Sequence, residues 1–120
     1  MDPEVARLFD AMAGSYDELE PWYEHLYEAL HALLRAHLRP APGPFRPVAL
    51  DAGCGTGLQA AVLEALGYET HGADLSRGLL EVARRRLRRP VLTRADLVAL
   101  PYRDGAFDAV TCCGSTLSFV

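Results

Sequence analysis

Residues 48–57 read VALDAGCGTG, and this stretch decides the fold of the chain. Its first three residues, 48–50, form a short apolar run that predicts a buried strand. Three alternating glycines follow: Gly53, Gly55 and Gly57. Residues 58–66 then predict a helix that ends at Gly67. A glycine turn between a strand and a helix lets a ligand approach backbone N–H groups at the positive helix end, so the stretch predicts a binding loop.

Strands and helices continue to alternate after this loop. The pattern predicts strands at 69–73, 91–94 and 107–113, a helix at 76–88 and a polar turn at 102–105. Alternation of this kind is typical of an α/β fold with a doubly wound parallel sheet. We therefore expect the strands to lie parallel, with the binding loop at one edge of the sheet.

Two helices and a proline-rich segment precede this domain. Apolar residues at helical spacing predict helices over residues 2–12 and 21–38. Residues 39–47 contain four prolines and one glycine, which exclude a helix and indicate a stiff connector. We accordingly divide the chain into a helical, lid-like segment (1–38), the connector and a ligand-binding domain (48–120).

Composition narrows the class of partner. Half of the 120 residues are apolar and 23% are charged, which is typical of one globular domain. The formal charge of −4 offers no general attraction to nucleic acid or to an anionic membrane, so we expect a small-molecule partner. No apolar run reaches the roughly 18 residues of a membrane span, and no signal sequence opens the chain, which predicts a cytoplasmic protein. Three cysteines without CxxC spacing indicate reduced thiols and no metal site.

Two kinds of cofactor are compatible with the glycines alone. Gly55, Gly57 and Ala60 also satisfy the dinucleotide pattern, and Asp74 lies near the expected distance of about 20 residues for an acid that binds ribose. An NAD-dependent oxidoreductase is therefore one alternative. Asp51 favours the other, because a carboxylate immediately before the loop repels a pyrophosphate but suits a ligand with an ammonium and a sulfonium.

The motifs LDAGCGTG, GADLS and RADLVALP together resemble the class I S-adenosylmethionine-dependent methyltransferases. The resemblance covers nearly the whole chain and implies the first four strands of their Rossmann-like fold. It implies S-adenosylmethionine as cofactor, S-adenosylhomocysteine as product and methyl transfer to an N, O or C atom of a small acceptor. The chain lacks the Asn/Asp-Pro-Pro-Tyr/Phe signature of enzymes that methylate amide or nucleobase nitrogens, which argues against nucleic acid as substrate.

The resemblance also assigns roles to individual residues. The loop glycines approach the methionine part of the cofactor, Asp74 binds the ribose hydroxyls, and Asp96 meets the adenine amino group. Leu75 either packs on adenine or belongs to the core, and Leu97 offers a backbone N–H. Tyr16 either closes over the cofactor or is a buried residue that joins the leading helices to the sheet. The candidate cofactor-binding residues are Tyr16, Asp51, Gly53, Cys54, Gly55, Gly57, Asp74, Leu75, Asp96, Leu97 and Gly114.

Catalysis and chain length are linked in this reading. A sulfonium is already a reactive leaving group, so alignment in a dry site supplies much of the acceleration, and we name no catalytic residue. Gly114 follows the fourth strand, where it permits close approach of the acceptor. The chain stops in an apolar run at 115–120 without a stop signal, so we expect a C-terminally truncated domain. A cofactor-binding fragment without turnover therefore remains a third alternative.

Overall fold

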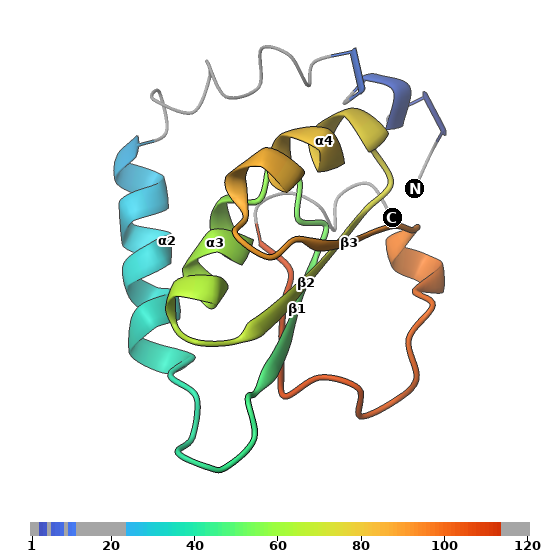
Figure 1. Ribbon diagram of the computed structural model, residues 1–120. Helices are drawn as coiled ribbons and strands as arrows, with labels where there is room; N and C mark the ends of the chain where they lie inside the picture. Colours follow the sequence, from blue (N-terminus) through green and yellow to red (C-terminus); the bar gives the residue numbers. More distant parts are fainter. Residues whose placement is uncertain (1–2, 5, 9, 12–23, 114–120) are drawn as a thin grey trace.

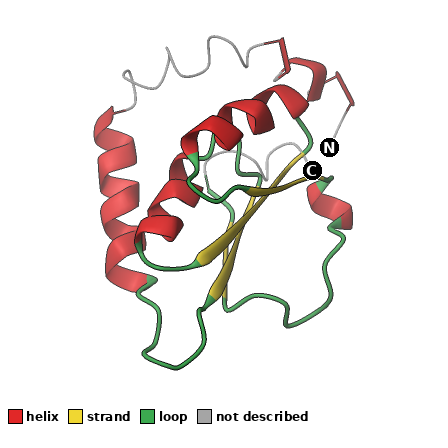
Figure 2. Cartoon of the chain, in the orientation of Figure 1, coloured by secondary structure: helices red, strands yellow, loops and turns green. Residues whose placement is uncertain are grey.

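The computed structural model describes residues 3–4, 6–8, 10–11 and 24–113. A four-stranded parallel sheet forms its centre, in the order β3-β2-β1-β4 (Figures 1 and 2). The strands are β1 (Val48–Ala52), β2 (Glu69–Asp74), β3 (Val91–Arg94) and β4 (Ala109–Thr111). This order is typical of a doubly wound sheet, in which the strand order reverses between β1 and its neighbour β4. The predicted parallel α/β fold is confirmed.

Within residues 24–113, three α-helices accompany the sheet: α2 (Glu24–His37), α3 (Leu58–Ala65) and α4 (Arg77–Arg86). The connections from β1 to β2 and from β2 to β3 run in the same direction, so right-handed crossovers place α3 and α4 on one face. The connection from β3 to β4 runs back and covers the opposite face with a short 3-10 helix, η2 (Leu97–Ala99) (Figure 1). The helix α2 packs against α3.

Side chains alternate between the two faces of β1 and build two separate apolar layers. Ala49 packs on the α3 face, in a cluster with the buried Leu63 and Tyr68. Leu50 points to the opposite face and packs with Ala52 and Ala73. Partly buried side chains from the β3–β4 connection and the end of β4 cover this second layer: Leu97, Leu100, Tyr102, Phe107 and Cys112. The connection therefore provides the cover that a longer helix often supplies.

The element boundaries differ from the expected ones where capping or pairing intervenes. The fourth strand is shorter than 107–113 and begins only after Asp108. The Asp108 N–H donates to the Val48 carbonyl over 2.7 Å, and the Asp108 carboxylate accepts from the Val48 N–H. The helix α4 is shorter than 76–88, because Ser76 caps its N-terminus and Leu87 its C-terminus. The 3-10 helix was not expected from the sequence.

The leading segment is described only in part. Residues 3–4, 6–8, 10–11 and 24–37 are helical, whereas 38–47 have no regular structure, as expected for the connector. Residues 21–23 of the expected second helix lie outside the described residues. Among the helices in the described ranges, none has both the length and the apolar character needed to cross a bilayer.

Candidate functional site

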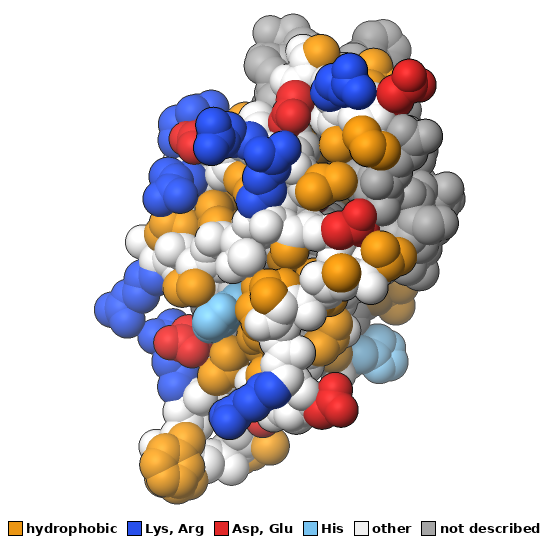
Figure 3. All heavy atoms as spheres, turned by 90° about the vertical axis from the view of Figure 1, so that its right-hand side faces the viewer, with side chains coloured by type: hydrophobic (Ala, Val, Ile, Leu, Met, Phe, Trp, Pro, Cys, Tyr) orange, Lys and Arg blue, Asp and Glu red, His pale blue; other side chains and the backbone are white. Residues whose placement is uncertain are grey.

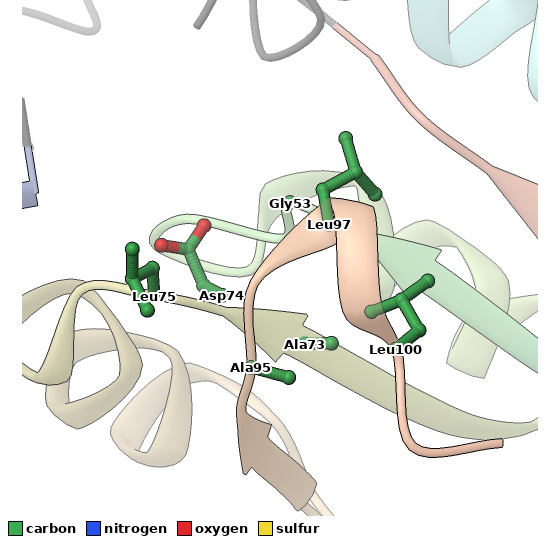
Figure 4. Close-up of a pocket in the computed structure, with 7 residues that line it drawn as sticks. All are labelled: Gly53, Ala73, Asp74, Leu75, Ala95, Leu97 and Leu100. Atoms are coloured by element: carbon green, nitrogen blue, oxygen red, sulfur yellow. The ribbon is translucent and has the colours of Figure 1, made fainter. Parts of the chain in front are cut away.

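A pocket lies at the carboxyl ends of β1 and β2, the edge at which ligands of open α/β sheets bind. It is shallow: the empty space among its lining residues is about 240 Å³ when open solvent is counted, but the enclosed part has room for about one water molecule. The lining residues are Gly53, Ala73, Asp74, Leu75, Ala95, Leu97 and Leu100 (Figure 4). Asp74 and Leu75 stand on one side and the leucines of the η2 region on the other, so a carboxylate and apolar side chains face the same space.

The glycine loop is fastened to the end of β2. The N–H groups of Gly53 and Cys54 both donate to the Ala73 carbonyl, over 2.7 and 3.0 Å. Gly53, Gly55 and Gly57 all have positive φ angles, of 70°, 54° and 89°, which residues with a Cβ rarely adopt. The backbone conformation of the loop therefore favours glycine at all three positions before α3 begins.

Gly57 also allows α3 and α4 to approach each other. A Cβ atom added to Gly57 would lie 3.1 Å from the Ala83 Cβ atom of α4. Arg86, one turn farther along α4, reaches the loop and donates from Nη1 to both the carbonyl and the hydroxyl of Thr56, each over 3.0 Å. The loop is thus held from β2 on one side and from α4 on the other.

Asp74 holds the loop with its carboxylate. Its Oδ2 accepts a hydrogen bond from the Gly55 N–H and its Oδ1 accepts one from the Ser76 N–H, both over 2.9 Å. Burial raises the pKa of Asp74 above its usual value, the N–H donors oppose that rise, and the Asp10 carboxylate adds to it. A carboxylate has about four acceptor positions, and the N–H groups of Gly55, Ser76 and Leu75 all interact with it, so Asp74 retains acceptor capacity for a ligand donor.

Asp51 lies behind the loop, at the point between β1 and β4 where the strand order reverses. Its side chain is 1% exposed, and its Oδ1 accepts a hydrogen bond from the Thr111 hydroxyl over 2.8 Å. Burial raises the pKa of Asp51 to about 7, the Thr111 hydroxyl opposes this rise, and the Asp74 charge adds to it. Its Oδ2 is buried and has no hydrogen-bond partner among the described residues. Asp51 therefore influences the pocket through space and does not line it.

The remaining predicted residues are distributed unequally. Leu75 and Leu97 line the pocket with Gly53 and Asp74. Asp96 does not line it: its side chain caps η2 by accepting a hydrogen bond from the Val98 N–H over 3.2 Å. The Cys54 side chain, 3% exposed, faces the sheet, where a Cβ atom added to Gly72 would lie 2.9 Å from its sulfur atom. Tyr16 and Gly114 lie outside the described residues.

Sequence reasoning missed several residues of this region. Leu100 follows η2, a helical turn that the sequence did not reveal. Ala73 and Ala95 line the pocket from the ends of β2 and β3. Asp10 carries no local signal, since its contacts are made far along the chain. Its Oδ1 accepts hydrogen bonds from the Ser76 hydroxyl and from the Gly78 N–H, which lowers the pKa of Asp10.

The arginine-rich run at the end of α4 lies apart from the pocket residues. Arg84, Arg85, Arg88 and Arg89 are exposed, whereas Arg86 is partly buried. The backbone N–H groups of Arg88 and Arg89 are capped by the two carboxylate oxygens of Glu64. Figure 3 shows basic side chains gathered toward one side of the surface. Within the described ranges, no three His, Cys, Asp or Glu residues lie together as metal ligands.

Comparison of the sequence with known families and proteins follows the same line. Residues 50–120 match the family model described as methyltransferase domain. The demethylmenaquinone methyltransferase of Clavibacter sepedonicus is 37% identical over 115 residues, which are 90% of this chain and 44% of that protein. The malonyl-[acyl-carrier protein] O-methyltransferase of Halorhodospira halophila is 37% identical over 112 residues, 88% of this chain and 36% of that protein. The chain thus spans less than half the length of these relatives.

Solved structures resemble this chain in three dimensions as well. A SAM-bound amino pentose methyltransferase from Micromonospora echinaspora matches with a TM-score of 0.66 and 29% identity, covering 78% of this chain and 39% of that one. A sugar N-methyltransferase from a Streptoalloteichus species matches with a TM-score of 0.68 and 27% identity, covering 87% of this chain and 41% of that one.

Proposed function

Because this chain belongs to the methyltransferase domain family, we propose that it binds S-adenosylmethionine at the pocket beside Asp74 and serves methyl transfer to a small-molecule acceptor. The observation that carries the proposal is the fixed Asp74 carboxylate. The Gly55 and Ser76 N–H groups hold it in place and leave acceptor capacity facing the pocket. Such a group is suited to the two hydroxyls of a ribose, which is the role that the family resemblance assigns to it.

The pocket fits the rest of that cofactor in chemical character. Leu75, Leu97 and Leu100 offer apolar contact to a flat adenine ring, and Gly53 removes side-chain bulk from the approach. The buried Asp51 carboxyl group lies behind the loop, and its charged form would act through space with a sign that suits an ammonium or sulfonium and not a pyrophosphate. Asp96 stands one residue before η2, so a role toward the adenine amino group remains part of the proposal.

Bound S-adenosylmethionine supplies an activated methyl group on a sulfonium. The chain itself has a simpler task, which is to bind, to orient and to exclude water. The loop and Asp74 would hold the ligand at the edge of the sheet, and the buried Asp51–Thr111 hydrogen bond joins β1 and β4 behind the loop. No acid or base needs to act on the cofactor in this scheme, so acceleration comes from alignment.

A small molecule is the acceptor that the relatives favour. The comparison proteins named above are methyltransferases of demethylmenaquinone, of malonyl-[acyl-carrier protein], of an amino pentose and of a sugar. They differ in the atom that they methylate, so we propose the class of acceptor and leave the atom among N, O and C. We also propose a cytoplasmic location. Nucleic acid is not the proposed substrate, because the net charge is negative and the signature of nitrogen methylation is missing.

Calorimetric titration of the 120-residue chain with S-adenosylhomocysteine tests the proposal directly. We expect binding, and at least tenfold weaker binding in Asp74→Ala, because hydrogen bonds to a charged group contribute about 1.5–3 kcal/mol. Asp104→Ala is the matched control, since Asp104 is exposed and lies away from the pocket residues. Binding of NADH without binding of S-adenosylmethionine or S-adenosylhomocysteine would contradict the proposal and restore the oxidoreductase alternative.

A further inference from the structure

The turn from Asp74 to Ser76, which carries the pocket carboxylate, is held by two residues from distant segments. Arg94, at the end of β3, donates from Nε to the Leu75 carbonyl over 2.9 Å. Asp10, in the N-terminal helical residues, accepts from the Ser76 hydroxyl over 2.5 Å and from the Gly78 N–H over 2.9 Å. Both residues contact the turn at backbone or capping groups, and neither is among the residues that line the pocket.

A continuous series of hydrogen bonds joins Asp10 to the glycine loop. Asp10 accepts from the Ser76 hydroxyl, the Ser76 N–H donates to Asp74 Oδ1, and Asp74 Oδ2 accepts from the Gly55 N–H. Ser76 is 1% exposed, and its hydroxyl oxygen also accepts from the Leu79 N–H over 3.2 Å. The Ser76 hydroxyl can therefore donate in only one direction, and Asp10 determines that direction.

The position of Asp10 is also electrostatically favourable. Its carboxylate stands at the N-terminus of α4, where the free N–H groups and the helix dipole stabilise a negative charge. The guanidinium groups of Arg94 and Arg77 lie close enough to add to this stabilisation. Ala6, one helical turn before Asp10, is 6% exposed, so this part of the N-terminal helical segment is buried as well. The N-terminal residues thus dock on the capped end of α4.

We propose that Asp10 is a positioning residue for the cofactor site, which couples docking of the N-terminal helical residues to the orientation of Asp74. The inference rests on the proposed function for its ligand, but the coupling itself is a property of the ligand-free chain. If docking orders the turn for a ligand, then the ligand must stabilise docking by the same free energy, because coupling between two sites is reciprocal.

The experiment compares Asp10→Ala with Asp10→Asn and with Glu81→Ala, an exposed acid on α4. Asparagine retains an oxygen that accepts from Ser76 and Gly78, whereas alanine does not. We expect Asp10→Ala to bind S-adenosylhomocysteine about tenfold more weakly, within the usual range of coupling, and Asp10→Asn and Glu81→Ala to bind nearly as the wild type does. Ser76→Ala removes the same Ser76–Asp10 hydrogen bond from the other side. It should show a similar loss of affinity, and it replaces Asp10→Ala in the test if that variant fails to fold.

Amide hydrogen exchange, followed by NMR, separates this inference from the proposed function. Asp10 does not itself bind the Gly55 N–H, which donates to Asp74. Loss of the Asp10–Ser76 hydrogen bond should nevertheless loosen Asp74 and accelerate exchange at Gly55 in the ligand-free Asp10→Ala chain. Where the wild type binds S-adenosylhomocysteine and Asp10→Ala binds it equally well, the inference is wrong. Where the wild type binds none, the proposed function fails, and exchange at Gly55 alone tests the role of Asp10. Faster exchange in Asp10→Ala supports the positioning role, and unchanged exchange overturns it.

Discussion

Thr111 donates a hydrogen bond of 2.8 Å to Asp51, and this bond joins the carboxyl ends of β1 and β4. The two residues are adjacent in the parallel register of these strands. Both are buried, so the bond partly compensates the cost of removing a carboxyl group from water. Burial nevertheless raises the pKa of Asp51 to about 7, so at neutral pH this carboxyl group lies on the border between neutral and charged.

Protonation of Asp51 should make stability depend on pH. Its pKa is about 7 in the folded chain and about 3.9 in an unfolded one, so the folded state binds more protons between these values. The resulting stabilisation is fully present below pH 4 and is lost as the pH rises through 7. Asp51→Asn stays neutral, so the unfolding free energy of the wild type minus that of Asp51→Asn should decline from pH 4 to 8 in urea titrations.

The matched change for this prediction is Thr111→Val. The Thr111 hydroxyl lowers the pKa of Asp51, so its removal should move the decline to higher pH. A difference between wild type and Asp51→Asn that is constant or rises with pH would show that Asp51 is charged throughout.

Gly57→Ala should destabilise the chain by two separable costs. A residue with a Cβ at φ 89° costs about 1–2 kcal/mol, and overpacking against Ala83 adds about 1–3 kcal/mol. Gly67→Ala is the control, because Gly67 has φ 104° but no atom within 4 Å of the added Cβ. In chemical denaturation, the free energy of unfolding of Gly57→Ala should therefore be lower than that of Gly67→Ala. Equal losses in the two variants would mean that α4 moves away freely.

Arg86→Met should weaken the attachment of the glycine loop. The substitution removes two hydrogen bonds to Thr56 but keeps most of the side-chain length, and we expect a loss of about 1–3 kcal/mol in unfolding free energy. Arg85→Met, at an exposed position of the same helix, should change it by less than about 0.5 kcal/mol. If the two variants lose equal stability in denaturation curves, the Arg86 contacts are not stabilising.

The Cys54 thiol should be the least reactive of the three. Burial raises its pKa above the usual range, and the Asp51 and Asp74 carboxylates add to this, so little thiolate forms. Cys112 and Cys113 are only partly buried. A disulfide reagent at pH 8 should modify those two first and Cys54 only on unfolding, which peptide mass spectrometry can follow. Early labelling of Cys54 would contradict its placement behind the loop, and labelling in denaturant provides the control for all three.

The strand, glycine loop and helix of residues 48–65 were predictable because their signals are local. Apolar runs, alternating glycines and helical spacing act over a few residues, and β3 was predicted with its observed boundaries, Val91–Arg94. The start of β4 was less predictable, because it depends on pairing with β1, and Asp108 meets Val48 from 60 residues away. Local patterns therefore determined the fold class and the position of the binding loop.

The chemistry of the site depends on contacts that no local pattern reveals. Asp51 reads in the sequence as a charge beside the ligand, but the packing of β4 and α3 encloses it and raises its pKa to about 7. Cys54, in the middle of the loop motif, turns away from the pocket because Gly72 leaves room for its sulfur. Asp10 reaches Ser76 across 66 residues. Burial and hydrogen bonding are set by whichever segments meet in space, so sequence determined the residue types and tertiary packing determined their charge and direction.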